Sequence, residues 1–290
     1  MTEPLLPDIS DMARWLAVYR AVESDRKDAA FRDPFARALA GERGRLIPKA
    51  SIGEDVSWFF ALRTHMVDRF VAACVKNAGV DMVISLAAGL DARPYRLALP
   101  PALRWVEVDS PDILDYKAAI LSGEKPTCQL ERVPLDLSNT DARRGLFARL
   151  GGSCTKALVV SEGTLIHLMS YDVRELASDL AEVPGFHHWV VDICSPGFRE
   201  MMTERTGDMA RMAGSPYLFS PREGPSFFDG CGWRVVDVRS LLKAGRRLNR
   251  LPLFLRMMEM LPESSGAQGS RPWAGVCLLQ RQPPDSPVSD

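Results

Sequence analysis

The 290-residue chain is 46% hydrophobic and 25% charged, a composition that fits one large globular domain or one domain with a substantial extension. Its formal net charge of -1 excludes a global attraction to nucleic acid or to anionic membranes. The acidic, proline-containing N-terminus is not a secretory signal, and no apolar stretch approaches the roughly 18 to 20 residues that span a bilayer, so we expect a cytoplasmic protein.

The first quarter of the chain has the periodicity of amphipathic helices. From residue 11 to about residue 31, apolar side chains recur at helical spacing with charged residues between them. Asp33 and Pro34 open a second predicted helix with the proline in its first turn, and a third spans residues 55–77 before a glycine stop. We predict that residues 1–78 form a helical extension that helps to cover the active site.

Strands and helices alternate after this extension. Five short apolar runs rich in β-branched residues predict strands, and helical segments separate them. These runs are residues 82–87, 104–109, 129–135, 156–161 and 188–194. Such alternation is typical of a parallel sheet with helices on both faces.

The C-terminal part of the chain predicts two further strands, at residues 233–238 and 273–281. The long link between them has no strong helix signal, so we expect an antiparallel return. Residues 79–282 therefore form a doubly wound α/β domain with a mostly parallel, seven-stranded sheet. We expect a lid insert at about residues 196–225, after the fifth strand, and a disordered tail at residues 283–290.

Candidate binding residues follow the first two strands of the predicted sheet. Ligands of open α/β sheets bind at the carboxyl ends of the strands. The first strand runs into Ala87, Ala88 and Gly89, whose small side chains let a ligand approach the backbone. The second ends in Asp109, about twenty residues after the glycine, where a carboxylate can accept hydrogen bonds from a ribose diol.

The next two strands also end beside acids, at Asp136 followed by Leu137 and at Glu162. Any one of these acids can be a helix cap. However, four successive strands end near candidate binding residues, and together these ends indicate a nucleoside-type cofactor. The four residues are Gly89, Asp109, Asp136 and Glu162. A dinucleotide would require three spaced glycines to cradle its pyrophosphate, whereas this loop has one glycine and an acid, Asp91. S-adenosylmethionine has no phosphate and carries a sulfonium cation, so it is the predicted cofactor.

The sequence around these residues resembles the leucine carboxyl methyltransferase family. The central block is VISLAAGLDARPYRLALPPALRWVEVDSPDILDYKAAIL, at residues 83–121. The other blocks are YRAVE with FRDPF near residues 19–35, ALRT at 61–64, VSEGTLIHL at 160–168 and CGWRV at 231–235. The five ordered blocks lie within residues 10–282. The family includes bacterial members associated with methylating polyketide-type and other small acids in secondary metabolism.

The resemblance implies a class I methyltransferase-like fold and assigns cofactor contacts to matching positions. Arg63, together with Arg20, would hold the methionyl carboxylate by charge-assisted hydrogen bonds. The other implied contacts are Asp109 with the ribose, Asp136 and Leu137 with the adenine, and Glu162 with the methionine moiety. Alternatively, Arg63 has no binding role and is only a polar position on an amphipathic helix.

Two positions depart from the family pattern. The family usually has Gly-x-Gly in the first loop, whereas Ala87 stands here at the first glycine, and its methyl group would crowd the cofactor unless the loop shifts. The family commonly has tyrosine where this chain has His167, at a position that faces the reaction centre by analogy. This change implies altered substrate choice or an added base.

Methyl transfer is an in-line displacement, so the protein mainly positions the reactants. A carboxylate acceptor is ionised at neutral pH and needs no base. We therefore expect His167 to orient the carboxylate of a small, apolar or aromatic, polyketide-like acid, with help from Arg199. Tyr217 belongs to the adaptable apolar side chains of the insert that are expected to line the substrate pocket.

Two alternatives remain open from the sequence. A hydroxyl acceptor requires a base, and His167 has a suitable unperturbed pKa near 6.5. Alternatively, the fold has become a non-catalytic scaffold whose cofactor site is closed by Ala87. The identity of the acceptor and the oligomeric state are not determined by the sequence.

The remaining cysteine, histidine and basic positions predict no further site. Six cysteines occur singly, which favours buried free thiols over disulfides or a metal centre. His187 and His188 are adjacent and would point to opposite faces of a strand, so we expect no metal there. The basic segment at residues 243–250 is interpreted as a solvated helix face.

Overall fold

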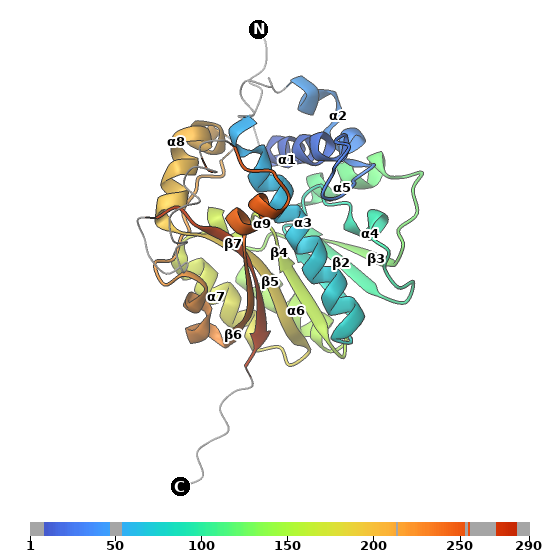
Figure 1. Cartoon of the computed structure of the whole chain (residues 1–290). Helices are drawn as coiled ribbons and strands as arrows, with labels where there is room; N and C mark the ends of the chain where they lie inside the picture. The colour runs from blue at the N-terminus through green and yellow to red at the C-terminus, as the bar shows by residue number, and fades with distance from the viewer. Residues whose placement is uncertain (1–8, 47–53, 213, 253–254, 256–270, 283–290) are drawn as a thin grey trace.

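The computed structural model describes residues 9–46, 54–212, 214–252, 255 and 271–282. A seven-stranded sheet in the order β3-β2-β1-β4-β5-β7-β6 forms the centre of the molecule (Figure 1). The strands are β1 (Met82–Leu86), β2 (Arg104–Asp109), β3 (Gln129–Pro134), β4 (Ala157–Ser161), β5 (Phe186–Cys194), β6 (Trp233–Ser240) and β7 (Ala274–Arg281). The first five are parallel, and β7 is antiparallel to β5 and β6. The predicted fold class, including the antiparallel return, is confirmed.

Helices surround this sheet. They are α1 (Ile9–Ser24), α2 (Ala36–Leu46), α3 (Glu54–Asn77), α4 (Arg93–Arg96), α5 (Pro111–Ile120), α6 (Thr140–Gly151), α7 (Ser170–Ala181), α8 (Pro196–Met212) and α9 (Leu241–Arg247). Two 3-10 segments, η1 (Leu165–His167) and η2 (Gly224–Cys231), complete the described elements.

The first two helices differ from their predicted bounds because local side-chain hydrogen bonds bend the chain. The first helix ends at Ser24, whose hydroxyl donates to the carbonyl of Arg20 and accepts the backbone N–H of Asp33. This brings the chain back against the end of α1. The carboxylate of Asp33 then accepts the N–H of Phe35 in a short turn, so α2 begins at Ala36 rather than at the predicted proline.

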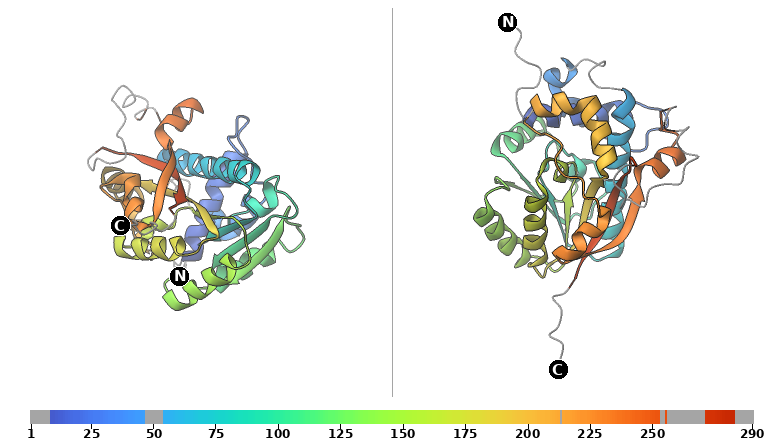
Figure 2. Two further views of the ribbon diagram at one scale, coloured as in Figure 1. Left: turned by 90° about the horizontal axis from the view of Figure 1, so that it is seen from below. Right: turned by 90° about the vertical axis from the view of Figure 1, so that its left-hand side faces the viewer.

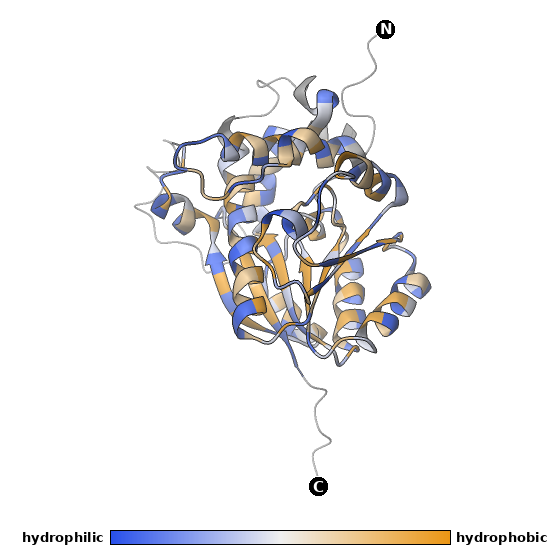
Figure 3. Cartoon of the chain, turned by 90° about the vertical axis from the view of Figure 1, so that its right-hand side faces the viewer, coloured by the Kyte–Doolittle hydropathy of each residue, from blue (hydrophilic) through white to orange (hydrophobic). Residues whose placement is uncertain are grey.

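The sheet is buried on both faces because alternate strand residues point to opposite sides. Val83 and Leu158 belong to a core cluster that includes Phe70 of α3. Their neighbours Ile84 and Val159 belong to a second cluster with side chains of α6 and α7. The strands are accordingly coloured as hydrophobic in Figure 3, while the surrounding helices carry both kinds of residue. Full burial of each such aliphatic side chain contributes about 1.5–3 kcal/mol.

Two helices lie over the carboxyl ends of the parallel strands. Figure 1 and the right-hand view of Figure 2 show α1 and α8 at this end of the sheet. They come from the predicted N-terminal extension and from the predicted insert, respectively. No helix in the described part of the chain is long and apolar enough to cross a membrane. The predicted disorder of residues 283–290 lies outside the described residues.

The six cysteines are free thiols, and five of them are buried. The basic segment 243–250 departs from its predicted role at one end. Lys243, Arg246 and Arg247 are exposed, as expected for a solvated face. Arg250, however, has a side chain that is only 5% exposed and forms ion pairs with Glu23 at 3.1 Å and with Asp28 at 2.8 Å, so it links the end of α9 to the end of α1.

Candidate active site

The loop after β1 and the end of β2 are joined by one side chain. One carboxylate oxygen of Asp109 accepts the backbone N–H of Gly89 at 2.6 Å, and the other accepts the N–H of Ser110 at 2.7 Å. Burial raises the pKa of Asp109, and these N–H donors partly oppose the rise. Each oxygen keeps a second lone pair, so the carboxylate can still accept hydrogen bonds from two hydroxyls.

The substitution at Ala87 leaves the loop in the conformation that glycine would adopt. Ala87 has a φ of 49°, and Gly89 has a φ of 51°. The left-handed region costs a residue with a side chain about 1–2 kcal/mol. The loop therefore has not shifted to a relaxed backbone, and the Ala87 methyl group remains on the wall of the cavity beside it.

This cavity, which we name the loop cavity, lies between the loop, α1 and α3. Its lining residues are Ala13, Leu16, Arg20, Arg63, Thr64, Ser85, Ala87, Ala88, Gly89, Leu90, Asp91, Arg93 and Glu162. Five of the predicted cofactor-binding residues are thus brought together from four separate segments of the chain. Arg20, Arg63, Ala87, Gly89 and Glu162 are the five.

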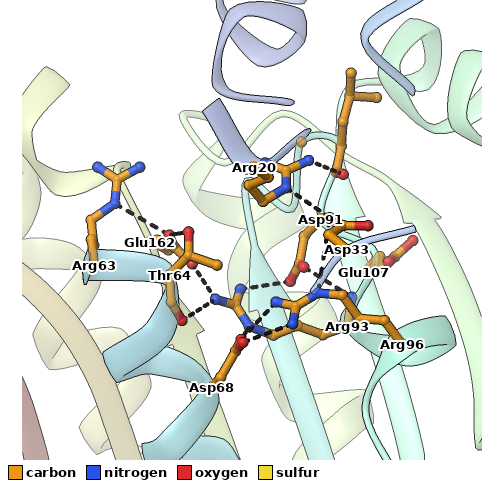
Figure 4. A network of polar contacts seen from close by, with 12 residues as sticks. Arg20, Asp33, Arg63, Thr64, Asp68, Asp91, Arg93, Arg96, Glu107 and Glu162 are labelled. Atoms are coloured by element: carbon orange, nitrogen blue, oxygen red, sulfur yellow. Dashed lines mark hydrogen bonds and ion pairs between the residues drawn. The ribbon is translucent and has the colours of Figure 1, made fainter. Parts of the chain in front are cut away.

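Glu162 lines the loop cavity and belongs to a network of charged side chains, in which it lies between Arg63 and Arg93 (Figure 4). Its carboxylate accepts from Arg63 Nε at 3.2 Å and from the Thr64 hydroxyl at 2.9 Å, and it pairs with Arg93 at 2.6 Å. Burial alone would raise the pKa of Glu162, but Arg93 and Arg63 outweigh burial and lower it. Glu162 is therefore ionised and fixed at neutral pH.

Arg93 holds this network together and was not identified from the sequence. Its guanidinium pairs with Asp68 at 2.7 Å and with Asp91 at 2.9 Å, in addition to Glu162. Arg20 is held separately, by Asp33 at 3.0 Å and by the carbonyl of Leu90 at 2.6 Å. Since the partners of Arg93 come from α3, from its own loop and from the end of β4, spacing along the sequence gives no signal for them.

Asp136 and Leu137 do not reach the loop cavity. Asp136 is exposed at the end of β3, and its carboxylate accepts the N–H of Ser138 at 2.9 Å, which lowers its pKa. The N–H of Leu135 donates to the carbonyl of Asp109, so the ends of β2 and β3 are adjacent. The adenine contacts of Asp136 and Leu137 stay predictions.

A second cavity, which we name the side pocket, shares Leu16 and Arg63 with the loop cavity. Its lining residues are Met12, Trp15, Leu16, Phe59, Phe60, Arg63, Gly163, Ile166, His167, Asp192, Met202 and Tyr217. Most of these side chains are apolar or aromatic. Met202 and Tyr217 come from the predicted insert. Among the described residues, Arg199 lines neither cavity and donates instead to the carbonyl of Leu218 at 3.0 Å.

Arg63 is the charged residue common to both cavities. Besides Glu162, it pairs with Asp192 of β5 at 3.4 Å. Asp192 also accepts the N–H of Gly163 at 2.6 Å, and its burial raises its pKa despite Arg63. A Cβ added at Gly163, where φ is 69°, would lie 2.9 Å from the Arg63 guanidinium, so glycine allows this approach. The signal for Asp192 was present in the sequence as a single acid within an apolar strand.

His167 is held in one orientation at the edge of the side pocket. Its Nδ1 lies 3.1 Å from the carbonyl oxygen of Pro216, and its ring lies against Tyr217, with centroids 5.7 Å apart. A carbonyl only accepts, so the hydrogen bond assigns the proton to Nδ1, and the Nε2 of the neutral ring carries a lone pair. Burial lowers the pKa of His167, the Pro216 and Ser215 carbonyls oppose this, and Arg63 lowers it further. The neutral ring therefore prevails at pH 7.

The sequence model of the leucine carboxyl methyltransferases matches residues 13–181, which include every residue that lines the loop cavity. The chain belongs to the leucine carboxyl methyltransferase family. A methyltransferase of Parafrankia sp., named as S-adenosyl-L-methionine-dependent, is 31% identical over 249 residues, covering 80% of this chain and 79% of the relative. A similarly named protein of Streptomyces coelicolor is 30% identical over 177 residues, covering 58% of this chain and 62% of that relative.

Among solved structures, a methyltransferase structure from Thermobifida fusca covers 97% of both chains with a TM-score of 0.58 and 17% identity, a likeness of fold. The chain is an S-adenosylmethionine-dependent methyltransferase. The residues of the loop cavity fit this cofactor, since Arg20 and Arg63 would supply cations for its carboxylate, and Glu162 and Asp91 would supply the opposite charge for its ammonium and sulfonium groups. Asp109 does not line the loop cavity itself, but it holds the loop at Gly89 and retains lone pairs that would accept hydrogen bonds from the ribose.

Proposed function

We propose that this methyltransferase forms a methyl ester on the carboxylate of a small apolar or aromatic acid, such as a polyketide-like acid of secondary metabolism. The observation that carries the proposal is the shared wall of Leu16 and Arg63 between the loop cavity and the side pocket. An acceptor in the side pocket would lie next to the cofactor site and against aromatic walls. Membership of a carboxyl methyltransferase family supports the same acceptor group.

The chemistry of ester formation makes few demands on the protein. S-adenosylmethionine supplies a methyl group on a sulfonium; the new C–O bond replaces the broken C–S bond, and the carboxylate and sulfonium charges cancel. No proton moves, so no general base is required. Phe59 and Phe60 would contact the acid and exclude water, while Arg63, Asp109 and Glu162 would hold the cofactor.

A hydroxyl acceptor is the second candidate, and the geometry of His167 favours it. Because the N–H at Nδ1 donates to the Pro216 carbonyl, the neutral ring has a lone pair at Nε2 and no second donor. Such a ring can remove the proton of a phenol as the oxygen is methylated. Orientation of a carboxylate by His167 would instead require an imidazolium, which the burial of the ring opposes.

The experiment that tests the proposal offers the purified chain two acceptors of one shape, 1-naphthoic acid and 1-naphthol, with S-adenosylmethionine. Mass spectrometry detects the methylated products, and mild base separates them because it hydrolyses an ester and leaves an ether. Methyl naphthoate as the main product supports the carboxylate proposal. Methoxynaphthalene alone would replace it with the hydroxyl candidate.

The scaffold alternative is tested separately by calorimetric titration with S-adenosylhomocysteine. Binding that disappears in Asp109→Ala supports an intact cofactor site, whereas no binding to the folded, ligand-free chain would mean that Ala87 has closed it.

We further propose that residues 1–78 and the insert at about residues 196–225 act as a lid over the strand ends. The contributions of α1 to both cavities, and of Met202 and Tyr217 to the side pocket, support it.

A further inference from the structure

Asp192 is a buried acid on β5 whose two carboxylate oxygens face two different donors. One oxygen accepts the backbone N–H of Gly163 at 2.6 Å, and the other lies 3.4 Å from Nη1 of Arg63. Asp192 is only 8% exposed. The cost of removing both charges from water offsets much of the attraction in a buried ion pair, so stability alone is a weak explanation for this one. Its effect on the position of Arg63 is a better explanation.

The guanidinium of Arg63 is anchored at two of its three nitrogens. Nε donates to Glu162 at the end of β4, and Nη1 donates to Asp192 on the neighbouring strand β5. A single hydrogen bond through Nε would let the planar group pivot about that contact, whereas a second one fixes its plane. The group also packs 5.6 Å and 5.2 Å from the ring centroids of Phe59 and Phe60.

The third nitrogen of Arg63, Nη2, is free to bind a ligand. It donates to no residue in the described part of the chain, and it is not one of the buried polar atoms that lack a partner there. Nη2 therefore faces open space, and Arg63 lines both the loop cavity and the side pocket. Figure 4 shows the terminal nitrogens of Arg63 pointing away from Glu162.

We propose that Asp192 is a positioning residue, which holds the free end of Arg63 where it binds the methionyl carboxylate of the cofactor. The inference rests on the proposed cofactor role of Arg63 and is independent of the acceptor group. A guanidinium whose donors are already oriented loses less freedom when it binds a carboxylate, so it binds more tightly. Asp192 acts only through Arg63 and does not contact the cofactor.

Only a carboxylate can accept from both donors at this position. The amide of asparagine has one acceptor oxygen and one NH₂ group, which only donates. In Asp192→Asn, the NH₂ group would therefore face either the N–H of Gly163 or Nη1 of Arg63, and that hydrogen bond would be lost. The variant keeps the size of the side chain and removes the anchor.

The test measures binding of two cofactor analogues without turnover. Calorimetry compares S-adenosylhomocysteine with S-adenosyl-3-thiopropylamine, which keeps the adenosine, the sulfur and the ammonium group and lacks only the carboxylate. We expect Asp192→Asn to weaken binding of S-adenosylhomocysteine by about 10-fold and to leave binding of the decarboxylated analogue unchanged.

Asp179→Asn is the matched control. Asp179 is 3% exposed and pairs with Arg143 and Arg144, yet it lines neither cavity. Its replacement also breaks a buried ion pair, so it should lower the melting temperature and leave the affinities for both analogues unchanged.

Three outcomes would overturn the inference. Unchanged or tighter binding of S-adenosylhomocysteine by Asp192→Asn would mean that the acid only competes with the ligand carboxylate for Arg63. An equal loss for both analogues would mean that the packing of the site, or the attraction of the ammonium group, has changed. Equal affinity of the unsubstituted chain for the two analogues would mean that the carboxylate is not bound.

A second comparison uses Arg63→Ala as the background. Asp192→Asn should change neither affinity further there, because the group that it positions is absent. A further loss of S-adenosylhomocysteine binding alone would also overturn the inference. The double variant contains no unpaired arginine at this position, so the comparison remains possible if Asp192→Asn alone does not fold. A chain that binds both analogues as expected but makes no ester would contradict the proposed function and leave the role of Asp192 standing.

Discussion

The carboxylate of Asp109 accepts the backbone N–H of Gly89 at 2.6 Å, which fixes the loop after β1 to the end of β2. The same side chain retains lone pairs with which we propose that it binds the ribose. We expect Asp109→Ala to weaken S-adenosylmethionine binding by at least about 10- to 100-fold, since a charged acceptor is lost. Calorimetric titration measures the loss. The nearby exposed acid variant Asp112→Ala should bind normally, and normal binding by Asp109→Ala would contradict the ribose assignment.

The backbone strain at Ala87 predicts the effect of restoring glycine. Ala87→Gly removes about 1–2 kcal/mol of left-handed strain, and glycine loses about 0.5–1 kcal/mol more entropy on folding. The free energy of unfolding should therefore rise by no more than about 1.5 kcal/mol, while S-adenosylhomocysteine binds several-fold more tightly. Denaturant titration and calorimetry measure the two quantities. Ala88→Gly should bring only the entropic loss, and unchanged affinity in Ala87→Gly would mean that the methyl group does not touch the cofactor.

Ionised Glu162 neutralises two arginines, so Glu162→Gln should lower the free energy of unfolding by about 3–5 kcal/mol at pH 7. The folded-state pKa of Glu162 is lowered. Its stabilisation is therefore complete above the unfolded-chain pKa of about 4.3 and is lost as the pH falls through the folded pKa. The free energies of unfolding that denaturant titration gives at pH 7 and below pH 4 should differ less in Glu162→Gln than in the unsubstituted chain. Glu182→Gln, at an exposed position, should be as stable as the unsubstituted chain. If Glu162→Gln were equally stable at pH 7, the ion pairs of Glu162 with Arg63 and Arg93 would not stabilise the fold.

The strands and the strand-end acids could be predicted because they depend on local patterns. Apolar runs with β-branched residues give the strands, and parallel strands bring their carboxyl ends together at one edge. The partners of Arg93 and the contact of His167 with Pro216 could not be predicted in this way. They join segments that are far apart in the chain, and a single sequence does not indicate which charges or carbonyls meet.

The same limit applies to Trp15 and Tyr19. Helical spacing predicts that both side chains point inward from α1, and it does not reveal that their polar atoms lack partners. The lone acid Asp192, in contrast, could have been found from the sequence, because an acid in a central apolar strand requires a buried partner.

An unpaired buried hydroxyl destabilises the ligand-free chain, so Tyr19→Phe should stabilise it. Relief of about 1–3 kcal/mol would raise the melting temperature by a few degrees. Tyr116→Phe is the matched control. Its hydroxyl accepts from Arg14 at 2.6 Å and donates to the carbonyl of Leu39 at 3.0 Å, so its loss should lower the melting temperature. A lower melting temperature for Tyr19→Phe would indicate that the hydroxyl is paired in the ligand-free chain, with the Trp15 indole beside it as the partner.

The pH dependence of methyl transfer distinguishes the two roles of His167. Burial lowers its pKa below the usual value of about 6.5, so the ring gains its lone pair at Nε2 as the pH rises through that lower pKa. With 1-naphthol, the rate should rise over this range and then level off, and His167→Ala should reduce it by about 10²- to 10⁴-fold. With 1-naphthoate, the rate should be nearly flat and the variant nearly unaffected. Transfer of a labelled methyl group between pH 5 and 8 measures both.

His65→Ala is the control for this experiment. The Nδ1 of His65 also lies 2.9 Å from a carbonyl, that of Ala30, and burial lowers its pKa, yet it lines neither cavity. Its replacement should leave both pH profiles unchanged. A naphthoate rate that falls as the pH rises through the His167 pKa would show that the imidazolium orients the acid, because only the protonated ring can donate from Nε2 while Nδ1 remains bonded to Pro216.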